Sequence, residues 1–351
     1  MSAAQPKARQ RFPGLDPSVL QHPYDRAALN ALQKIPGLDI LVRKFIELFP
    51  ERVAYIQNVA QTVRVSSIQC PQLYALLQEA CAILDMREPE LYVAQTPIPN
   101  AFTSGHNNPY IVVTTGLLDL MNEDEVMGVI AHELGHIKSG HVLYKTMARI
   151  INLLLTIIGD MTLGLGRLIG RSIEAALLEW DRKSEFTADR SALLVVQDSQ
   201  VMLSLMMKLA GGTLFQRDQM SASEFLKQAD MYEEVDANVL DRIYKMLLVS
   251  AVNHPLIIVR AREIMNWSES PQYNDILAGR YPRARSSENR TNANNGNGNG
   301  NGSSRPEGTS TSFTPPPAPP TPTSSGLYLC PHCNREQPNR RFCSLCGGTI
   351  S

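Results

Sequence analysis

The stretch His132-Glu133-Leu134-Gly135-His136 is an H-E-x-x-H motif, and the rest of the sequence is best understood around it. On a helix, residues four apart share a face, so both imidazoles could bind one metal ion. Glu133 would then lie within reach of a water molecule on that ion. Two imidazole ligands, a carboxylate base and an open coordination position are what a zinc hydrolase needs. The motif therefore predicts a catalytic zinc site.

The flanking sequence predicts that the motif lies on a helix. Asn122 is a favoured N-cap residue, and Glu125, three residues later, completes a capping-box pattern. Apolar residues at helical spacing between 126 and 130 supply a buried face. Gly140 offers a helix end. The four-residue spacing of the histidines therefore has geometric meaning.

The sequence offers two sources for a third protein ligand. His141 is near, but a residue five positions after His136 points about 140° around the helix. The other source is Glu185, which shares a face of a second predicted helix with Asp189. Glu185 could ligate the metal, and Asp189 could accept the second N–H of a ligating histidine. A solvated acidic pair on a surface helix is the alternative for both acids.

Four elements follow one another along about half of the chain: Asn100-Ala101-Phe102-Thr103-Ser104-Gly105, the H-E-x-x-H motif, Arg182-x-x-Glu185-x-x-Ala188-Asp189-x-x-Ala192, and His254-Pro255 with Arg260. This set, in this order, resembles the HtpX-like and CAAX-prenyl-protease-type zinc metallopeptidases, which are gluzincins. The first element is similar to the N-A-F-x-x-G edge strand of that family, and the last to its H-P-x-x-x-x-R element.

The resemblance implies a mostly helical α+β domain of the zincin type with a small β-sheet. It implies that Glu185 is the third zinc ligand and that Asp189 orients a ligating histidine. It also implies that His254 helps to stabilise the oxyanion, and we expect Arg260 to anchor the loop that carries His254. A capping histidine before proline is the alternative for His254.

Substrate binding is also implied by the resemblance alone. Asn100, Ala101 and Phe102 would pair with the peptide, which adds a strand to the sheet. The alternative for Phe102 is packing in the core. Glu133 would take a proton from the attacking water and later give it to the leaving amine.

Composition limits the class of protein. A chain of 351 residues suggests two domains with connecting material, and 43% hydrophobic residues support a sizeable core. The net charge of −1 predicts no general attraction to nucleic acid or to an anionic membrane. Residues 1–14 lack an apolar core, so we expect no signal peptide.

We expect four segments: a disordered N-terminus at 1–14, the metallopeptidase domain at 15–275, a flexible linker rich in Asn, Gly, Ser and Pro at 276–326, and a zinc ribbon at 327–351. Within the domain we expect helices at 25–33, 38–49 and 72–84, strands at 91–94, 100–104 and 110–114, and mostly helices from there to about 267.

The cysteines of the tail predict a second, structural zinc. Two C-x-x-C pairs, separated by nine residues, are typical of a zinc ribbon: Cys330, Cys333, Cys343 and Cys346. A redox C-x-x-C is the alternative. The module is close to neutral once zinc is bound, which disfavours nucleic acid and favours an unknown protein partner. Cys70 and Cys81 are isolated and are expected to be buried thiols, so a reducing compartment fits all six.

One apolar stretch, 150–158, raises the question of a membrane span. Asp160 and Arg167 break the apolar character of the residues after it. A single span after the motif would put Glu185 on the wrong side of the membrane, and two spans need about 40 apolar residues. We therefore predict a helical hairpin at 142–181 that does not span, with peripheral membrane contact through 150–158 left open.

The sequence thus predicts a cytoplasmic zinc-dependent endopeptidase that cuts protein or peptide substrates, with a role in protein quality control. The alternative, from another class, is a non-catalytic adaptor with a protease fold whose ribbon mediates protein interaction. An intact Glu133 favours the enzyme.

Overall fold

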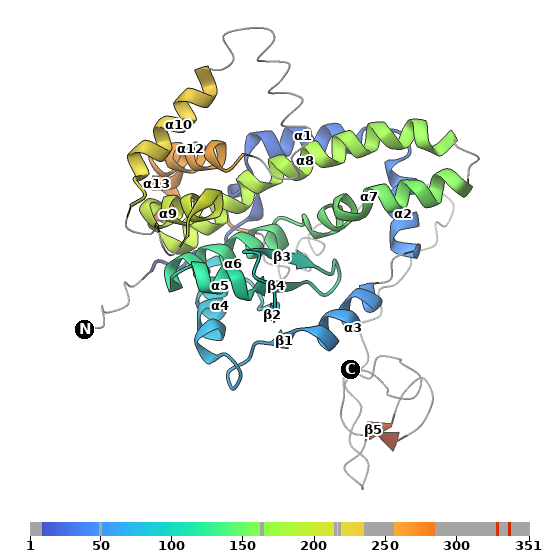
Figure 1. Cartoon of the computed structure of the whole chain (residues 1–351), viewed down its shortest axis with the longest axis horizontal. Helices are drawn as coiled ribbons and strands as arrows, with labels where there is room; N and C mark the ends of the chain where they lie inside the picture. The colour runs from blue at the N-terminus through green and yellow to red at the C-terminus, as the bar shows by residue number, and fades with distance from the viewer. Residues whose placement is uncertain are drawn as a thin grey trace, which may run out of the picture. The chain divides into compact units, whose positions relative to one another are not determined.

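The computed structural model describes residues 9–48, 51–161, 165–213, 216, 219–234, 256–284, 328–329 and 336–337. The chain divides into two units, Met1–Asn289 and Arg290–Ser351. The first unit is mostly helical (Figure 1). Its described helices are α1 Pro23–Gln33, α2 Leu38–Leu48, α3 Glu51–Gln61, α4 Pro71–Leu84, α5 Thr115–Leu120, α6 Glu123–Lys138, α7 Val142–Met161, α8 Leu165–Val196, α9 Ser199–Gly211, α10 Ala222–Glu234, α12 Ile257–Ser268 and α13 Pro271–Leu277.

A small sheet accompanies these helices. Its strands are β1 Val63–Arg64, β2 Glu90–Ala94, β3 Ala101–Ser104 and β4 Tyr110–Thr114. They lie in the order β1-β2-β4-β3, and only β2 and β4 are parallel. The three strands expected from the sequence are confirmed, and so is the mostly helical α+β character. The strand order leaves β3 at one edge of the sheet, where it contacts α6 and α7.

The helix that carries the H-E-x-x-H motif begins as its sequence predicts. The Oδ1 atom of Asn122 accepts a hydrogen bond from the N–H of Glu125 at 3.0 Å, and Glu125 Oε2 accepts one from the N–H of Asn122 at 2.8 Å. This reciprocal capping box satisfies two donors that a helix start leaves open. Just after the helix, Gly140 has a φ of +73°, which reverses the chain before His141.

Helices α6 and α8 approach closely at a glycine. A Cβ atom added to Gly135 would lie 2.6 Å from the Cβ of Ser191 on α8. Figure 1 shows the long α8 beside α1 and α7, and α6 contacts α8 as well as β3. Since α6 carries the histidine pair and α8 carries Glu185, this close approach sets the geometry of the site.

The segment 142–181, predicted to be a helical hairpin, contains two helices that contact each other, α7 and α8. Helix α8 continues without a break to Val196 and so carries both acidic residues of the second motif. Within the part of the chain that the structure describes, no helix combines the length and the hydropathy needed to cross a membrane.

The structure corrects both predicted boundaries of the domain. Residues 9–14, expected to be disordered, are packed: Phe12 is completely buried, and its N–H donates to the carbonyl of Ile83 at 2.9 Å. At the other end, ordered chain continues past residue 275 as far as Ala284, whose N–H donates to the carbonyl of Gly14 at 2.8 Å. A single apolar residue among polar ones gives no periodic signal, which explains the error at Phe12.

Two further details differ from expectation. Helix α3 was not predicted. Cys70, expected to be buried, is exposed at the N-terminus of α4 with a φ of 59°, so that prediction was wrong. Cys81 is buried as expected, and burial raises the pKa of its thiol to about 12.

In the second unit, β5 Tyr328–Leu329 pairs antiparallel with β6 Glu336–Gln337. The four tail cysteines, Cys330, Cys333, Cys343 and Cys346, lie outside the described residues, and so does His254.

Candidate metal centre and active site

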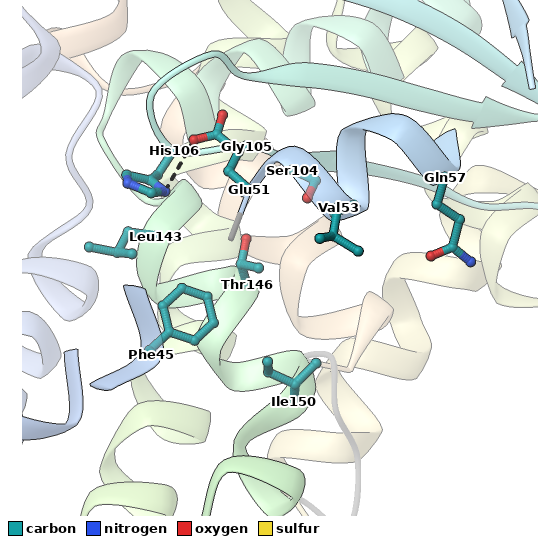
Figure 2. A pocket seen from close by; sticks show the side chains of 11 residues that line it. Phe45, Glu51, Val53, Gln57, Ser104, Gly105, His106, Leu143, Thr146 and Ile150 are labelled. Carbon is teal, nitrogen blue, oxygen red and sulfur yellow. Dashed lines mark ion pairs between the residues drawn. The ribbon is translucent and has the colours of Figure 1, made fainter. Parts of the chain in front are cut away.

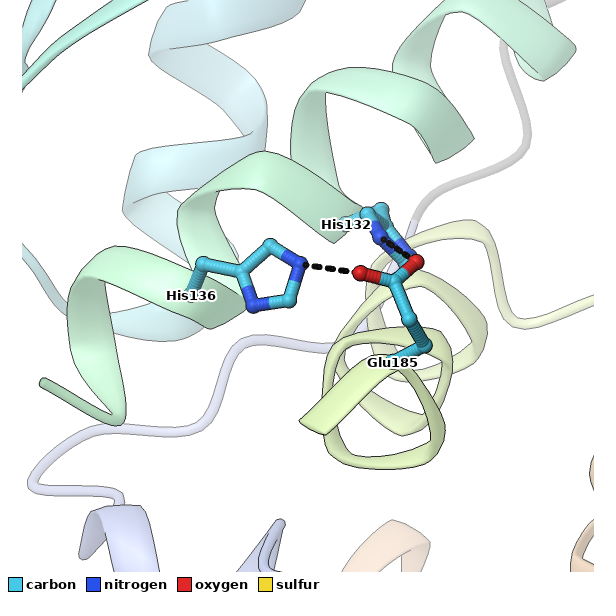
Figure 3. Close-up of side chains that lie close together, drawn as sticks. All are labelled: His132, His136 and Glu185. Atoms are coloured by element: carbon cyan, nitrogen blue, oxygen red, sulfur yellow. Dashed lines mark ion pairs between the residues drawn. The ribbon is translucent and has the colours of Figure 1, made fainter. Parts of the chain in front are cut away.

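Three of the predicted ligands converge. The candidate ligand atoms of His132, His136 and Glu185 lie within 4.8 Å of one another. Glu185 Oε2 lies 3.2 Å from His132 Nε2, and Oε1 lies 3.3 Å from His136 Nε2. Figure 3 shows the carboxylate, from α8, facing both imidazoles, from α6. Glu185 therefore meets both histidines in one site, although it follows His136 by 49 positions in the sequence.

The three side chains fit a zinc ion. Ligand atoms that are each about 2.0–2.1 Å from a tetrahedral zinc lie roughly 3.3 Å from one another. The separations of 3.2 and 3.3 Å, each to a different oxygen of Glu185, are close to this value. Two imidazole nitrogens and one carboxylate oxygen, with a fourth position free for water, are also a donor set typical of catalytic zinc.

Asp189 fixes the orientation of the first histidine. Its Oδ1 atom lies 3.0 Å from His132 Nδ1. Arg260, on α12, donates to both oxygens of Asp189, at 2.6 and 2.8 Å. Burial alone would raise the pKa of Asp189, but Arg260 and His132 together lower it below its usual value. An ionised Asp189 accepts the Nδ1–H of His132, which leaves Nε2 free to face the metal.

Arg260 supports the site from behind the ligands, since it contacts Asp189 and lies 3.3 Å from Glu185 Oε2. Its expected role as an anchor of the loop that carries His254 stays a prediction, because His254 lies outside the described residues. The side chain of Arg260 is 10% exposed. The local sequence could not predict the contact between Arg260 and Asp189, because it depends on how α12 packs against α8.

Lys145 is a further charged group in the site that the sequence did not reveal. Its Nζ donates to Glu185 Oε1 at 2.5 Å and to Asp181 Oδ1 at 2.8 Å. Burial would raise the pKa of Glu185, but Lys145 and His132 hold it well below its usual value. Glu185 is thus a carboxylate, the form that a metal ion binds.

The two histidines have different environments. Burial lowers the pKa of His132, but the carboxylates of Glu185 and Asp189 outweigh burial and raise it to about 9. Burial and the nearby charge of Lys145 hold the pKa of His136 well below its usual value. Before metal binds, therefore, His132 carries the additional proton of an imidazolium at neutral pH, whereas His136 is a neutral imidazole.

Glu133 has a partner that sequence analysis missed. The hydroxyl of Thr103 on β3 donates to Glu133 Oε2 at 2.6 Å. Glu133 is 6% exposed, and it lines the same cavity as the three candidate metal ligands. The only sequence signal was the two-residue strand period, which puts Thr103 and Ala101 on one face of β3.

The three residues predicted to bind substrate do not all line the same cavity. Asn100 and Ala101 line the cavity at the metal centre, whereas Phe102 does not. Phe102 packs against a cluster of buried aromatic residues, and the guanidinium of Arg149 lies 5.1 Å from the centre of its ring. Arg149 Nη1 also donates to the carbonyl of Thr103 at 2.8 Å.

Two hollows adjoin β3. The larger has a volume of about 500 Å³ and is lined by Glu133 and by all three converging ligands. The smaller, of about 320 Å³, lies among α2, α3, α7 and the end of β3, where Phe45, Thr146 and Ile150 line it (Figure 2). None of the three candidate ligands lines the smaller hollow, so the larger one is the candidate active site.

His141 is not part of the convergent set, although it is near. Its Nδ1 lies 3.1 Å from His136 Nδ1, the nitrogen that faces away from Glu185. His141, which helical spacing had already disfavoured as a metal ligand, thus also lies outside the set of converging ligand atoms.

The sequence of the chain is similar to a known protein family and to several known proteins. Residues 67–268 match the family model described as Peptidase family M48. The chain is 40% identical over 270 residues to the plastoglobule-localized metallopeptidase 48, chloroplastic, of Arabidopsis thaliana, which covers 76% of the chain and 77% of the relative. It is 31% identical over 169 residues to the protease HtpX homolog 2 of Methanosarcina mazei, covering 42% of the chain and 58% of the relative.

A third relative is the protease HtpX homolog of Streptococcus gordonii, 29% identical over 198 residues, covering 48% of the chain and 67% of the relative. A search of solved structures found no significant match. The family model covers more than half of the 351 residues and includes both α6 and α8, which hold the His-His-Glu site. On these grounds the chain belongs to peptidase family M48 and is an HtpX-type metallopeptidase.

Proposed function

We propose that the protein is a zinc-dependent endopeptidase of the gluzincin type that hydrolyses peptide bonds in protein substrates. The observation that carries this proposal is the convergence of His132, His136 and Glu185 beside Glu133 in one cavity of about 500 Å³. A cavity of this size lies within the range of about 300–1,000 Å³ that is typical of ligand sites.

The protein groups around the metal have separable tasks. A zinc ion held by His132, His136 and Glu185 would lower the pKa of a bound water and polarise the scissile carbonyl. Glu133 accepts the proton of the attacking water and delivers it to the leaving amine. The hydrogen bond from Thr103 leaves Glu133 Oε1 as the oxygen free for this transfer.

We further propose that the substrate adds a strand to the free edge of β3. In an antiparallel pair, alternate residues turn both backbone groups toward the neighbouring strand. Asn100 bonds inward to Thr114, and the carbonyl of Thr103 faces Arg149, so Ala101 and Thr103 offer their backbone groups outward. The peptide would then displace Arg149 from the carbonyl of Thr103.

For the remaining features we keep the expectations from sequence as proposals. Cys330, Cys333, Cys343 and Cys346 would bind a structural zinc, and that module would recruit a protein partner. Participation in protein quality control and a cytoplasmic location with peripheral membrane contact through 150–158 belong to the same proposal. The name of the Arabidopsis relative supports a chloroplastic alternative, and cell fractionation would decide between the two locations.

Replacing the general base tests the proposed chemistry. Glu133→Gln should retain zinc at the site, because all ligands remain, and should lose at least about 10²-fold in turnover of an unfolded protein substrate. Glu123→Gln is the matched control, because Glu123 is exposed in the first turn of the same helix. Zinc is measured by elemental analysis and turnover by fluorescent peptide release. Near-normal turnover by Glu133→Gln would refute the mechanism.

A further inference from the structure

The second histidine of the motif has partners behind it that come from outside both motifs. His136 Nδ1 lies 3.1 Å from His141 Nδ1. On the other side of the His141 ring, Nε2 lies 3.3 Å from Asp25 Oδ2. Asp25 belongs to α1 and is completely buried, and His141 is 2% exposed. A continuous row of polar groups therefore runs from the first helix of the chain to the metal centre.

We propose that His141 and Asp25 are positioning residues, which hold the His136 imidazole in the tautomer and orientation that zinc binding needs through two successive hydrogen bonds. This inference rests on the proposed zinc site. It extends that site to α1, which lies wholly before the region, residues 67–268, that the family model matches.

The hydrogen count of the row allows one consistent arrangement with neutral imidazoles. If His136 binds zinc through Nε2, its proton must be on Nδ1, which donates to His141 Nδ1. His141 then carries its own proton on Nε2 and donates it to the carboxylate of Asp25. Every ring nitrogen of the two histidines has one task, and none is left without a partner.

Asp25 is itself fixed from α8. Trp180 Nε1 donates to Asp25 Oδ1 at 2.9 Å, and the hydroxyl of Thr187 donates to Oδ2 at 2.6 Å. Burial raises the pKa of Asp25, but the hydrogen bonds from His141, Thr187 and Trp180 outweigh it and lower the pKa below its usual value. The row therefore ends in an ionised carboxylate held by the same helix that supplies Glu185.

Aromatic packing also holds the His141 ring in place. Its centre lies 5.4 Å from the Trp180 ring, which meets it edge-on at 89°. The ring of His136 lies 5.4 Å away on another side. His141 can therefore not swing toward the metal as a ligand without breaking its contacts with Asp25 and Trp180.

The two histidine ligands are thus supported in different ways. His132 reaches the carboxylate of Asp189 directly, at 3.0 Å. His136 reaches the carboxylate of Asp25 only through another imidazole. Outer partners of this kind fix the tautomer of a ligating histidine, and their removal typically costs about 10–100-fold in metal affinity.

The test measures metal affinity in the full chain rather than activity. Metal-free protein is titrated with zinc against a competing chelator, and separately with cobalt, whose absorption distinguishes a thiolate site in the tail from a nitrogen–oxygen site. His141→Ala should weaken zinc binding at the nitrogen–oxygen site by about 10–100-fold and change the cobalt spectrum of that site. His141→Asn keeps an oxygen acceptor near His136 Nδ1 and should lose less.

A double-mutant comparison separates the row from general destabilisation. Asp25→Asn should weaken zinc binding in the natural protein but have no further effect when His141 is already alanine, because the connection to His136 is then broken. Equal losses in both backgrounds would overturn the proposed row. Asp39→Asn, an exposed acidic residue on α2, is the matched control and should leave zinc affinity unchanged.

The outcomes also distinguish this inference from the proposed function. If the unaltered protein binds no metal at the nitrogen–oxygen site, both fail. If it binds zinc and the affinity and cobalt spectrum of His141→Ala are unchanged, only the positioning row is wrong. If Asp25→Asn does not fold, the two variants of His141 still test the inference. Zinc affinity should then be higher in His141→Asn than in His141→Ala, and equal affinities would contradict the hydrogen bond to His136.

Discussion

Among the side chains that the structure describes, the hydroxyl of Thr103 is the one that donates a hydrogen bond to Glu133, the proposed general base, at 2.6 Å. A hydrogen bond to a charged group contributes about 1.5–3 kcal/mol, and the bond here also selects which carboxylate oxygen faces the substrate. The residue follows directly after the N-A-F element, so its role depends on β3 lying beside α6.

Removing this hydroxyl should slow turnover and leave metal binding intact. Thr103→Val should lower kcat by roughly 10-fold or more, the amount expected from misplacing a base by a fraction of an ångström. Zinc affinity should not change, because Thr103 touches none of the three ligands. Thr103→Ser keeps the hydroxyl and should restore most of kcat. Steady-state kinetics on a short peptide checks this, and a serine variant as slow as the valine variant would contradict it.

The proton on His132 makes metal binding depend on pH. In the metal-free protein the pKa of His132 is raised to about 9, so the ring is charged at neutral pH and must lose its proton to bind zinc. Apparent zinc affinity should therefore rise about tenfold per pH unit from pH 7 and level off near pH 9. Chelator competition at several pH values measures this rise.

Asp189→Asn provides the comparison for that experiment. It removes one of the two carboxylates that raise the pKa of His132, so the rise in affinity should end at a lower pH. An apparent affinity that is independent of pH between 7 and 9 would contradict the assignment of this proton.

Among the elements, the contact between α6 and α8 at Gly135 decides the spacing of the ligands. Because a Cβ there would lie 2.6 Å from Ser191 Cβ and 3.1 Å from Ala188 Cα, an added methyl group must push the helices apart. His136 follows directly after Gly135, so displacement there changes the distance to Glu185.

Gly135→Ala should therefore lower both stability and zinc affinity. Overpacking of a dense core typically costs about 1–3 kcal/mol. Gly211→Ala is the matched control, because a Cβ at Gly211, in α9, meets no atom within 4 Å. The control should stay within about 1 kcal/mol of the natural protein. Thermal unfolding with and without zinc checks both variants, and equal behaviour of the two would contradict the close approach.

The elements show which features the sequence could predict. Asn122 and Glu125 lie three residues apart, and their capping box could be predicted because it is a local signal. Asp25, Thr103 and Lys145 reach the site through contacts between elements distant in sequence, and no local pattern carries such contacts. The role of Glu185 falls between these cases, since its spacing from Asp189 was visible but its meeting with the histidines required the family resemblance.

At the scale of the whole molecule, the two ends of the peptidase unit are joined. Leu15 forms a β-bridge with Arg283, and the ring of Tyr281 meets that of Phe12 edge-on at 6.0 Å. Ile276, at the end of α13, is 1% exposed. A boundary at residue 275 would remove all of these contacts, whereas a boundary at 289 removes none of them.

Two truncations should therefore behave differently. Residues 1–289 should form a folded peptidase that binds one zinc and cuts a short peptide at a rate similar to the full chain, because every described group of the active site precedes Ala284. Residues 1–275 should unfold at a lower temperature, because the contacts of Ile276, Tyr281 and Arg283 are lost.

Both shorter chains should lack preference for a partner recruited by the tail, since a tethered module raises local concentration without adding chemistry. If residues 1–289 fold but fail to cut a short peptide, the tail is part of the catalytic machinery, and the division into a peptidase and a recruiting module is wrong.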